Sequence, residues 1–173
     1  RALGHDGALI MLGAEPVGPY QRPPLSKKYV SGELVPDRLL IRPPSWYAEQ
    51  GIELRLSASV GGISPADRSL ILTDGTQLPY DRLALTTGAT PRSLPAEMGG
   101  ALAGVHTIRS LADADAIAPA LRAGRKLLVV GGGYIGLEAA AVAASKGLAV
   151  TVIEAAPRIL QRVAAPLTSD FFR

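Results

Sequence analysis

Residues 126–154, KLLVVGGGYIGLEAAAVAASKGLAVTVIE, form the stretch that decides the fold. An apolar run leads into a glycine-rich turn at residues 131–136, an alanine-rich segment follows, and a second β-branched run ends at Glu154. This order predicts a strand, a glycine turn, a helix and a second strand. A βαβ unit that ends in an acid is typical of a dinucleotide-binding site, and we favour that interpretation over a chance glycine turn.

The glycines and the acid of this stretch each have an expected task. Gly131 permits the tight turn, Gly133 lets the backbone approach a pyrophosphate, and Gly136 lets the helix pack closely on the strand. The N–H groups at the start of the helix face the phosphates. Glu154 accepts hydrogen bonds from a ribose 2′-OH and repels a 2′-phosphate, which favours NAD(H) over NADP(H), although Arg158 weakens that preference.

Composition places the chain among globular proteins and excludes sulfur chemistry. Its 173 residues are 47% hydrophobic and 19% charged, enough to bury a core. The chain has no cysteine, so disulfides, thiolate metal sites and a redox-active C-x-x-C pair are excluded within it. Its two histidines have no ligand-like neighbours, so we expect no metal site.

The distribution of charge and of apolar residues bears on partners and location. The net charge is +3, the basic residues are scattered and only 5% of residues are aromatic. This pattern disfavours nucleic acid and suits an acidic protein partner. We find no apolar run long enough to span a membrane and no leader-like segment, so we expect a cytoplasmic protein that does not bind membranes.

The N-terminal third suggests a second nucleotide-binding unit. Residues 1–7 are expected to end a helix, residues 8–12 to form a strand, and Glu15 to close it with an acid. On this interpretation a glycine turn precedes residue 1, and we expect both ends of the chain to be truncated. A chance glutamate after a short strand explains the segment equally well.

Proline and glycine divide the region that follows. Four prolines at residues 16–28 predict an extended, rigid loop that is either a structural arm or a pocket wall, with Ser26 or Ser31 capping short turns. Residues 45–51 predict a capped helix. A three-stranded antiparallel meander is expected within residues 52–85, with a turn at Asp74 and Gly75, before a buried strand at residues 83–85.

The linking and C-terminal segments predict helices. A helix is expected at residues 111–121, with Ser110 as its N-cap and Arg109 just before it, and another near Pro166. Between the meander and the first of these helices, small residues around Thr87 and Gly88 allow a close approach of backbone to ligand.

Three motifs then carry a resemblance to a known family. They are YQRPPLSK within residues 19–27, YDRL leading into TGATPR at residues 80–92, and VGGGYIGLE at residues 130–138. Together they resemble the FAD-dependent pyridine nucleotide oxidoreductases, in the ferredoxin (putidaredoxin or rubredoxin) reductase branch. The resemblance implies an α/β fold of two nested Rossmann-like, glutathione-reductase-like domains, both incomplete, with the meander in the first. The FAD-binding domain would cover residues 1–108 and the NAD-binding domain residues 109–173.

The resemblance also implies roles for single residues. Lys27 would lie beside the flavin ring and face Glu138, and this catalytic pair would help to position the nicotinamide. Taken alone, Lys27 is more often a solvated surface lysine, and Glu138 could simply complement the helix dipole. The cofactor-binding residues implied for FAD and NAD(H) are Glu15, Arg22, Lys27, Val60, Thr87, Gly88, Arg109, Gly131, Gly133, Tyr134, Ile135, Gly136 and Glu154.

The function implied is that of an NADH-dependent ferredoxin reductase. It would pass a hydride from NADH to FAD and then single electrons to a small iron–sulfur protein, a [2Fe-2S] ferredoxin or rubredoxin, and so feed an oxygenase. Two alternatives stay open: an NADH oxidase or peroxidase-like flavoenzyme, which the absence of cysteine makes less attractive, and a non-catalytic nucleotide-binding fragment.

Overall fold

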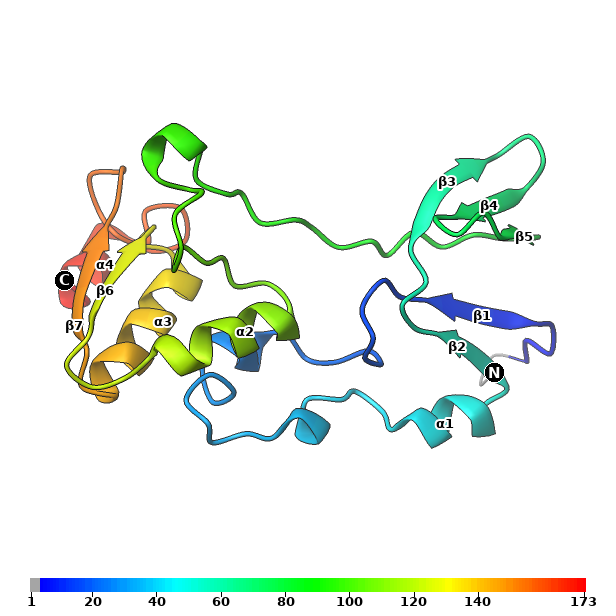
Figure 1. Cartoon of the computed structure of the whole chain (residues 1–173), viewed down its shortest axis with the longest axis horizontal. Coiled ribbons are helices and arrows are strands. Elements are labelled where there is room, and N and C mark those ends of the chain that lie inside the picture. Colours follow the sequence, from blue (N-terminus) through cyan, green and yellow to red (C-terminus); the bar gives the residue numbers. More distant parts are fainter. Residues whose placement is uncertain (1–3) are drawn as a thin grey trace. The chain divides into compact units, whose positions relative to one another are not determined.

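The computed structural model describes residues 4–173, which divide into two compact units (Figure 1). The first unit comprises the chain up to Gln21 together with Asp37–Ala89, and the second comprises Arg22–Pro36 with Thr90–Arg173. Along the sequence, the chain therefore contributes first to unit one, then to unit two, again to unit one, and finally to unit two. The division into nucleotide-binding domains at residues 108 and 109 stays a prediction.

The first unit contains a parallel pair of strands and an antiparallel sheet. Strand β1 (Leu9–Leu12) pairs in parallel with β2 (Ile52–Arg55), which follows helix α1 (Pro44–Glu49). Strands β3 (Val60–Ser64), β4 (Ser69–Leu72) and β5 (Gln77–Pro79) form an antiparallel sheet in chain order. The predicted meander and the strand before Glu15 are therefore confirmed.

The second unit is built on the predicted βαβ stretch. Strand β6 (Lys126–Val130), helix α3 (Tyr134–Ser145) and strand β7 (Ala149–Ile153) follow one another, and the two strands are parallel. Helix α2 (Leu111–Ile117) and helix α4 (Pro166–Phe171) complete the α-helices. The short 3-10 helices are η1 (Pro23–Ser26), η2 (Pro36–Arg38), η3 (Ala96–Met98) and η4 (Ala118–Ala120).

The β6–β7 pair has one covered face and one exposed face. Its residues alternate between half-buried and exposed, as the two-residue period of a strand requires. The half-buried face packs on α3, whose Ala140 and Ala143 are buried. The exposed face carries Leu128, Val130 and Ile153, whose side chains are about half exposed.

The predicted N-cap of α2 at Ser110 is confirmed, and Asp113 adds a second bond to it. The Ser110 hydroxyl accepts a hydrogen bond from the backbone N–H of Asp113, and the Asp113 carboxylate accepts one from the backbone N–H of Ser110. This reciprocal pair is a capping box, which satisfies two N–H groups that the first turn of a helix leaves without partners.

Several local predictions were wrong. Residues 83–85 form no strand, and Leu85 is 63% exposed, because no strand of the described chain pairs with them. Helix α1 begins at Pro44, so Ser45 lies inside it and does not cap it. Neither Ser26 nor Ser31 caps a helix, and the proline loop is not extended at η1. Of the helix end expected at residues 1–7, residues 4–7 are not helical and residues 1–3 lie outside the described residues.

Residues 4–173 contain neither a helix suited to a membrane nor a metal-binding cluster. No helix there is both long and apolar enough to cross a membrane. No group of three or more histidine, aspartate or glutamate side chains in the same range is arranged to hold a metal ion.

Candidate functional site

The glycine turn after β6 has the conformation that its residues predict. Gly131 has a φ of +114°, which favours glycine. A Cβ on Gly136 would lie 2.0 Å from the carbonyl oxygen of Gly131, so only glycine allows helix α3 this close to the turn. A Cβ on Gly133 would meet nothing within 4 Å. The space beside Gly133 is open, and the start of α3, which no side chain caps, adjoins it.

Glu154 follows β7 and is tied to the glycine turn. Its Oε2 accepts the backbone N–H of Gly132 at 2.7 Å, and its Oε1 accepts that of Ala156 at 2.7 Å. The hydrogen bonds from Ala156 and Gly132 hold the pKa of this carboxyl below its usual range. The acid therefore stays ionised and fixes the position of the turn.

The segment after Glu154 holds the other side of Gly132. The backbone N–H of Leu160 donates to the Gly132 carbonyl at 2.9 Å, although Leu160 has a φ of +55°. Arg158 donates to the carbonyl of Ala164 at 2.7 Å and to the hydroxyl of the buried Ser169 at 2.6 Å. Arg158 is thus engaged in holding its own loop to α4.

A second cluster joins the proline arm, residues 22–36, to α3. The Lys27 ammonium lies 2.8 Å from Oε1 of Glu138, and the Ser26 hydroxyl donates to Oε2 of Glu138 at 2.6 Å. Partial burial alone would raise the pKa of Glu138. The hydrogen bonds from Lys27 and Ser26 and the charge of Lys27 outweigh that effect, so the pKa is lowered.

The arm also contacts α2 and the residue before its cap, and that residue is itself bonded to α2. The Arg22 guanidinium donates to the backbone carbonyl of Arg109 at 2.8 Å. The Asp113 carboxylate accepts the backbone N–H of Arg109 at 2.9 Å. Farther along the arm, the Tyr29 hydroxyl donates to the Asp115 carboxylate at 2.6 Å. The pKa of Tyr29 is raised to about 12, mainly by burial and in addition by this hydrogen bond and the Asp115 charge.

The arm, the start of α2 and the first turns of α3 enclose one cavity of about 440 Å³. Its exposed lining is mostly apolar, with several charged or polar side chains at its walls, a combination suited to an aromatic ligand with polar edges. The lining residues are Arg22, Pro23, Leu25, Ser26, Lys27, Ile108, Arg109, Tyr134, Ile135 and Glu138.

The first unit has its own cluster around Glu15. The Tyr20 hydroxyl donates to Oε2 of Glu15 at 2.6 Å. The backbone N–H of Ser57 donates to the Glu15 carbonyl at 3.1 Å, and that of Ala58 donates to the Gly13 carbonyl at 2.9 Å. The link between β2 and β3 is therefore fixed to the end of β1.

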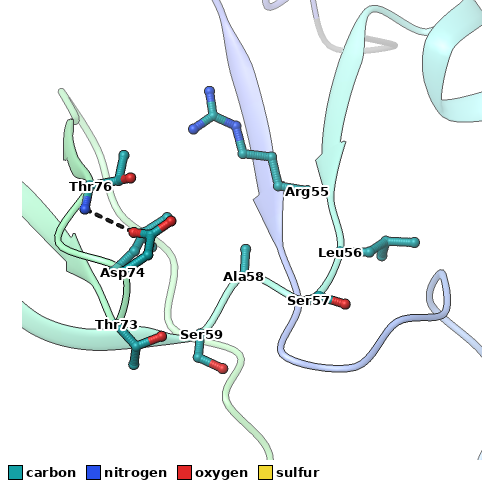
Figure 2. A pocket seen from close by; sticks show the side chains of 9 residues that line it. Arg55, Leu56, Ser57, Ala58, Ser59, Thr73, Asp74 and Thr76 are labelled. Carbon is teal, nitrogen blue, oxygen red and sulfur yellow. Dashed lines mark hydrogen bonds between the residues drawn. The ribbon is translucent and has the colours of Figure 1, made fainter.

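Beside this link lies a second cavity, of about 390 Å³ (Figure 2). It is lined by residues 55–59 and by the turn after β4, in which Asp74 accepts the backbone N–H of Thr76 at 2.8 Å. Val60 follows these residues at the start of β3. Thr87 and Gly88 lie in an irregular exposed segment, where Gly88 has a φ of +73°.

Six of the predicted site residues thus line one cavity: Arg22, Lys27, Arg109, Tyr134, Ile135 and Glu138. Gly131, Gly133, Gly136 and Glu154 belong to the same unit at the glycine turn, whereas Glu15, Val60, Thr87 and Gly88 belong to the other unit. Sequence reasoning overlooked Asp113 and Leu160 as supports of the site. Ser26 lies in the YQRPPLSK motif, but the sequence predicts only a capping role for it.

Comparison with known proteins agrees with the fold and with these motifs. The family model of the pyridine nucleotide-disulphide oxidoreductases matches residues 1–172. The chain belongs to this family, and the resemblance predicted from its motifs is confirmed.

Two curated relatives and one solved structure are especially similar. The 5,5′-dehydrodivanillate O-demethylase ferredoxin reductase subunit of a Sphingobium species is 44% identical over 172 residues, which are 99% of this chain and 42% of the relative. Putidaredoxin reductase CamA of Pseudomonas putida is 42% identical over 174 residues, 99% of this chain and 41% of that protein. The reductase in a covalent putidaredoxin reductase–putidaredoxin complex matches with a TM-score of 0.91 and 41% identity, over 99% of this chain and 42% of that one.

These matches confirm the α/β, Rossmann-like fold class. The chain spans about two fifths of the length of the relatives that it matches.

Proposed function

We propose that this protein is an NADH-dependent flavoprotein reductase that delivers electrons to a small iron–sulfur protein, a [2Fe-2S] ferredoxin or rubredoxin, in an oxygenase system. The observation that carries the proposal is the Lys27–Glu138 ion pair at 2.8 Å, in a cavity that also contains Tyr134 and Ile135 from the first turn of α3. A charge pair held beside this glycine turn can help to orient a bound redox cofactor.

The residues present fit both proposed cofactors. The open side of Gly133 and the uncapped start of α3 suit the pyrophosphate of NAD(H), and the ionised Glu154 suits a ribose without a 2′-phosphate. For FAD, the proposed binding residues are Glu15, Arg22, Lys27, Val60, Thr87, Gly88 and Arg109. The 440 Å³ cavity has the mixed polar and apolar walls that a flavin ring needs.

The chain's own residues would orient and shield the cofactors. Bound FAD would supply the chemistry that links the two-electron hydride of NADH to single-electron transfer. Lys27 supplies a positive charge at the cavity, and Glu138 balances it and holds the ammonium in place. The half-exposed Tyr134 and Ile135 cover the side of the cavity next to the glycine turn.

Absorption spectra of the purified chain test the proposal. Flavin bands that NADH bleaches, together with reduction of cytochrome c that requires an added [2Fe-2S] ferredoxin, are the expected result. Lys27→Met should slow flavin reduction at least about tenfold, whereas Lys28→Met, which alters the adjacent exposed lysine of the same arm, should not.

Other outcomes identify the alternative functions. Oxygen consumption with NADH that needs no iron–sulfur protein would indicate an oxidase and would overturn the proposal. Colourless protein that binds NAD and takes up no added FAD would indicate a nucleotide-binding module and would overturn it as well.

Three further assignments remain proposals. These are an FAD-binding domain over residues 1–108, an NAD-binding domain over residues 109–173, and a cytoplasmic location. The net charge of +3 supports an acidic protein partner, as small electron carriers often provide.

A further inference from the structure

We propose that Ser26 is a positioning residue, which holds the carboxylate of Glu138 so that one of its oxygens is presented to Lys27. The inference deepens the proposed function and rests on it for its catalytic meaning. Ser26 acts through Glu138, and we assign it no contact with a cofactor.

The local backbone explains why the Ser26 hydroxyl has a fixed direction. Pro23 and Pro24 begin η1 with preset φ angles, and the backbone N–H groups of Lys27 and Tyr29 both donate to the Pro24 carbonyl. This tight turn buries Leu25 and Ser26, which are 2% and 5% exposed. A buried hydroxyl on a rigid turn has few orientations available.

The two oxygens of Glu138 have separate partners. Ser26 donates to Oε2 at 2.6 Å, and Lys27 lies 2.8 Å from Oε1. The Lys27 side chain is 47% exposed, so its long stem can adopt many rotamers in water. The buried hydrogen bond from Ser26 therefore fixes the orientation of the Glu138 carboxylate. The exposed Lys27 ammonium then pairs with a carboxylate that is already oriented.

The surrounding charges do not replace this bond. The other charged or titratable side chains that line the cavity are Arg22, Arg109 and Tyr134. Arg22 is directed to the Arg109 carbonyl, and no hydrogen bond joins any of the three to Glu138 among the described contacts. Without the Ser26 hydroxyl, one oxygen of a partly buried carboxylate would lose its donor, and the carboxylate could turn away from Lys27.

The test is a titration of the Glu138 carboxyl carbon by NMR in the full chain, with the resonance assigned from Glu138→Gln. Ser26→Ala should raise the pKa of Glu138. Ser26→Cys, which keeps the size but donates weakly, should give a smaller rise and guards against a folding defect in the alanine variant. Ser31→Ala is the matched control, because both acceptors within reach of the Ser31 hydroxyl, the Lys28 backbone carbonyl and the Glu33 carboxylate, belong to the arm.

A second measurement connects the titration to electron transfer. Reduction of FAD-loaded protein by NADH should be about tenfold slower in Ser26→Ala, the factor expected for one hydrogen bond to a charged group. In the pH–rate profile of this reduction, the fall in rate on the acid side should move to higher pH, together with the Glu138 titration. An unchanged Glu138 titration in both Ser26 variants, or an equal change in Ser31→Ala, would overturn the inference. If NADH does not reduce the wild-type protein, the proposed reductase function fails, while the titration, which needs no cofactor, still decides whether Ser26 orients Glu138.

Discussion

The carboxylate of Glu154 is joined to the backbone N–H of Gly132 at 2.7 Å, so the end of β7 and the glycine turn after β6 are held as one structure. The acid that would bind a nucleotide ribose thus also supports the turn that would bind its pyrophosphate. Substitutions at Glu154 should affect both.

Acid should loosen the glycine turn. Because the folded-state pKa of Glu154 lies below the ordinary value of 4.5, its stabilising contribution is complete above that pH. It is lost as pH falls through the folded-state pKa. We expect the amide resonances of Gly132 and Ala156 to shift as Glu154 protonates. In Glu154→Gln, which cannot ionise, a matching shift over the same pH range would show that another group is responsible.

Nucleotide preference should change in Glu154→Arg. Removing the negative charge and adding a guanidinium should raise the affinity for NADPH relative to NADH by about tenfold. Arg158 should not substitute for the new arginine, because it is bonded to Ala164 and Ser169. Calorimetric titration with both nucleotides measures the ratio. An unchanged ratio would contradict the proposed position of the ribose.

Alanine substitutions at two glycines of the turn should have different effects, on stability at Gly136 and on NAD binding at Gly133. Gly136→Ala places a Cβ 2.0 Å from the Gly131 carbonyl oxygen and should destabilise the second unit by at least about 2 kcal/mol. Gly133→Ala meets open space and should cost less than about 1 kcal/mol, yet weaken NAD binding at least about tenfold. Urea denaturation and NAD titration of both variants measure these effects. Equal loss of stability in the two would contradict this assignment.

The Tyr29–Asp115 hydrogen bond should increase the free energy of unfolding at neutral pH and lose this effect at alkaline pH. The pKa of Tyr29 is raised from 10.0 to about 12, so its contribution is complete below pH 10 and disappears as pH rises through about 12. Tyr29→Phe should lose about 0.5–1 kcal/mol at neutral pH. Absorbance at the phenolate band follows the ionisation. Asp115→Asn removes the charge that contributes to the shift and should lower the Tyr29 pKa.

Local patterns in the sequence were sufficient for much of the fold. The βαβ stretch, the meander and the N-cap at Ser110 depend on residues close together in the chain, so spacing and residue type predict them. The apolar residues 83–85 look like a strand by the same criteria. Their actual structure depends on whether another strand lies beside them, which spacing does not reveal.

Long-range contacts limited prediction of the site. Only a family motif pairs Lys27 with Glu138, since on its own Lys27 is more often a surface lysine and Glu138 could simply complement the helix dipole. Ser26 and Glu138 are 112 positions apart, and no periodicity relates them. The left-handed Leu160 likewise reaches Gly132 through a loop conformation that residue types do not specify.

The exposed face of the β6–β7 pair has a practical consequence for work with this chain. The solvent-facing side of this parallel strand pair is hydrophobic, because it exposes Leu128, Val130 and Ile153. Parallel sheets are ordinarily covered on both sides. Such a surface promotes self-association during concentration and storage. Light scattering should therefore accompany every measurement, and dilute samples are the safer choice.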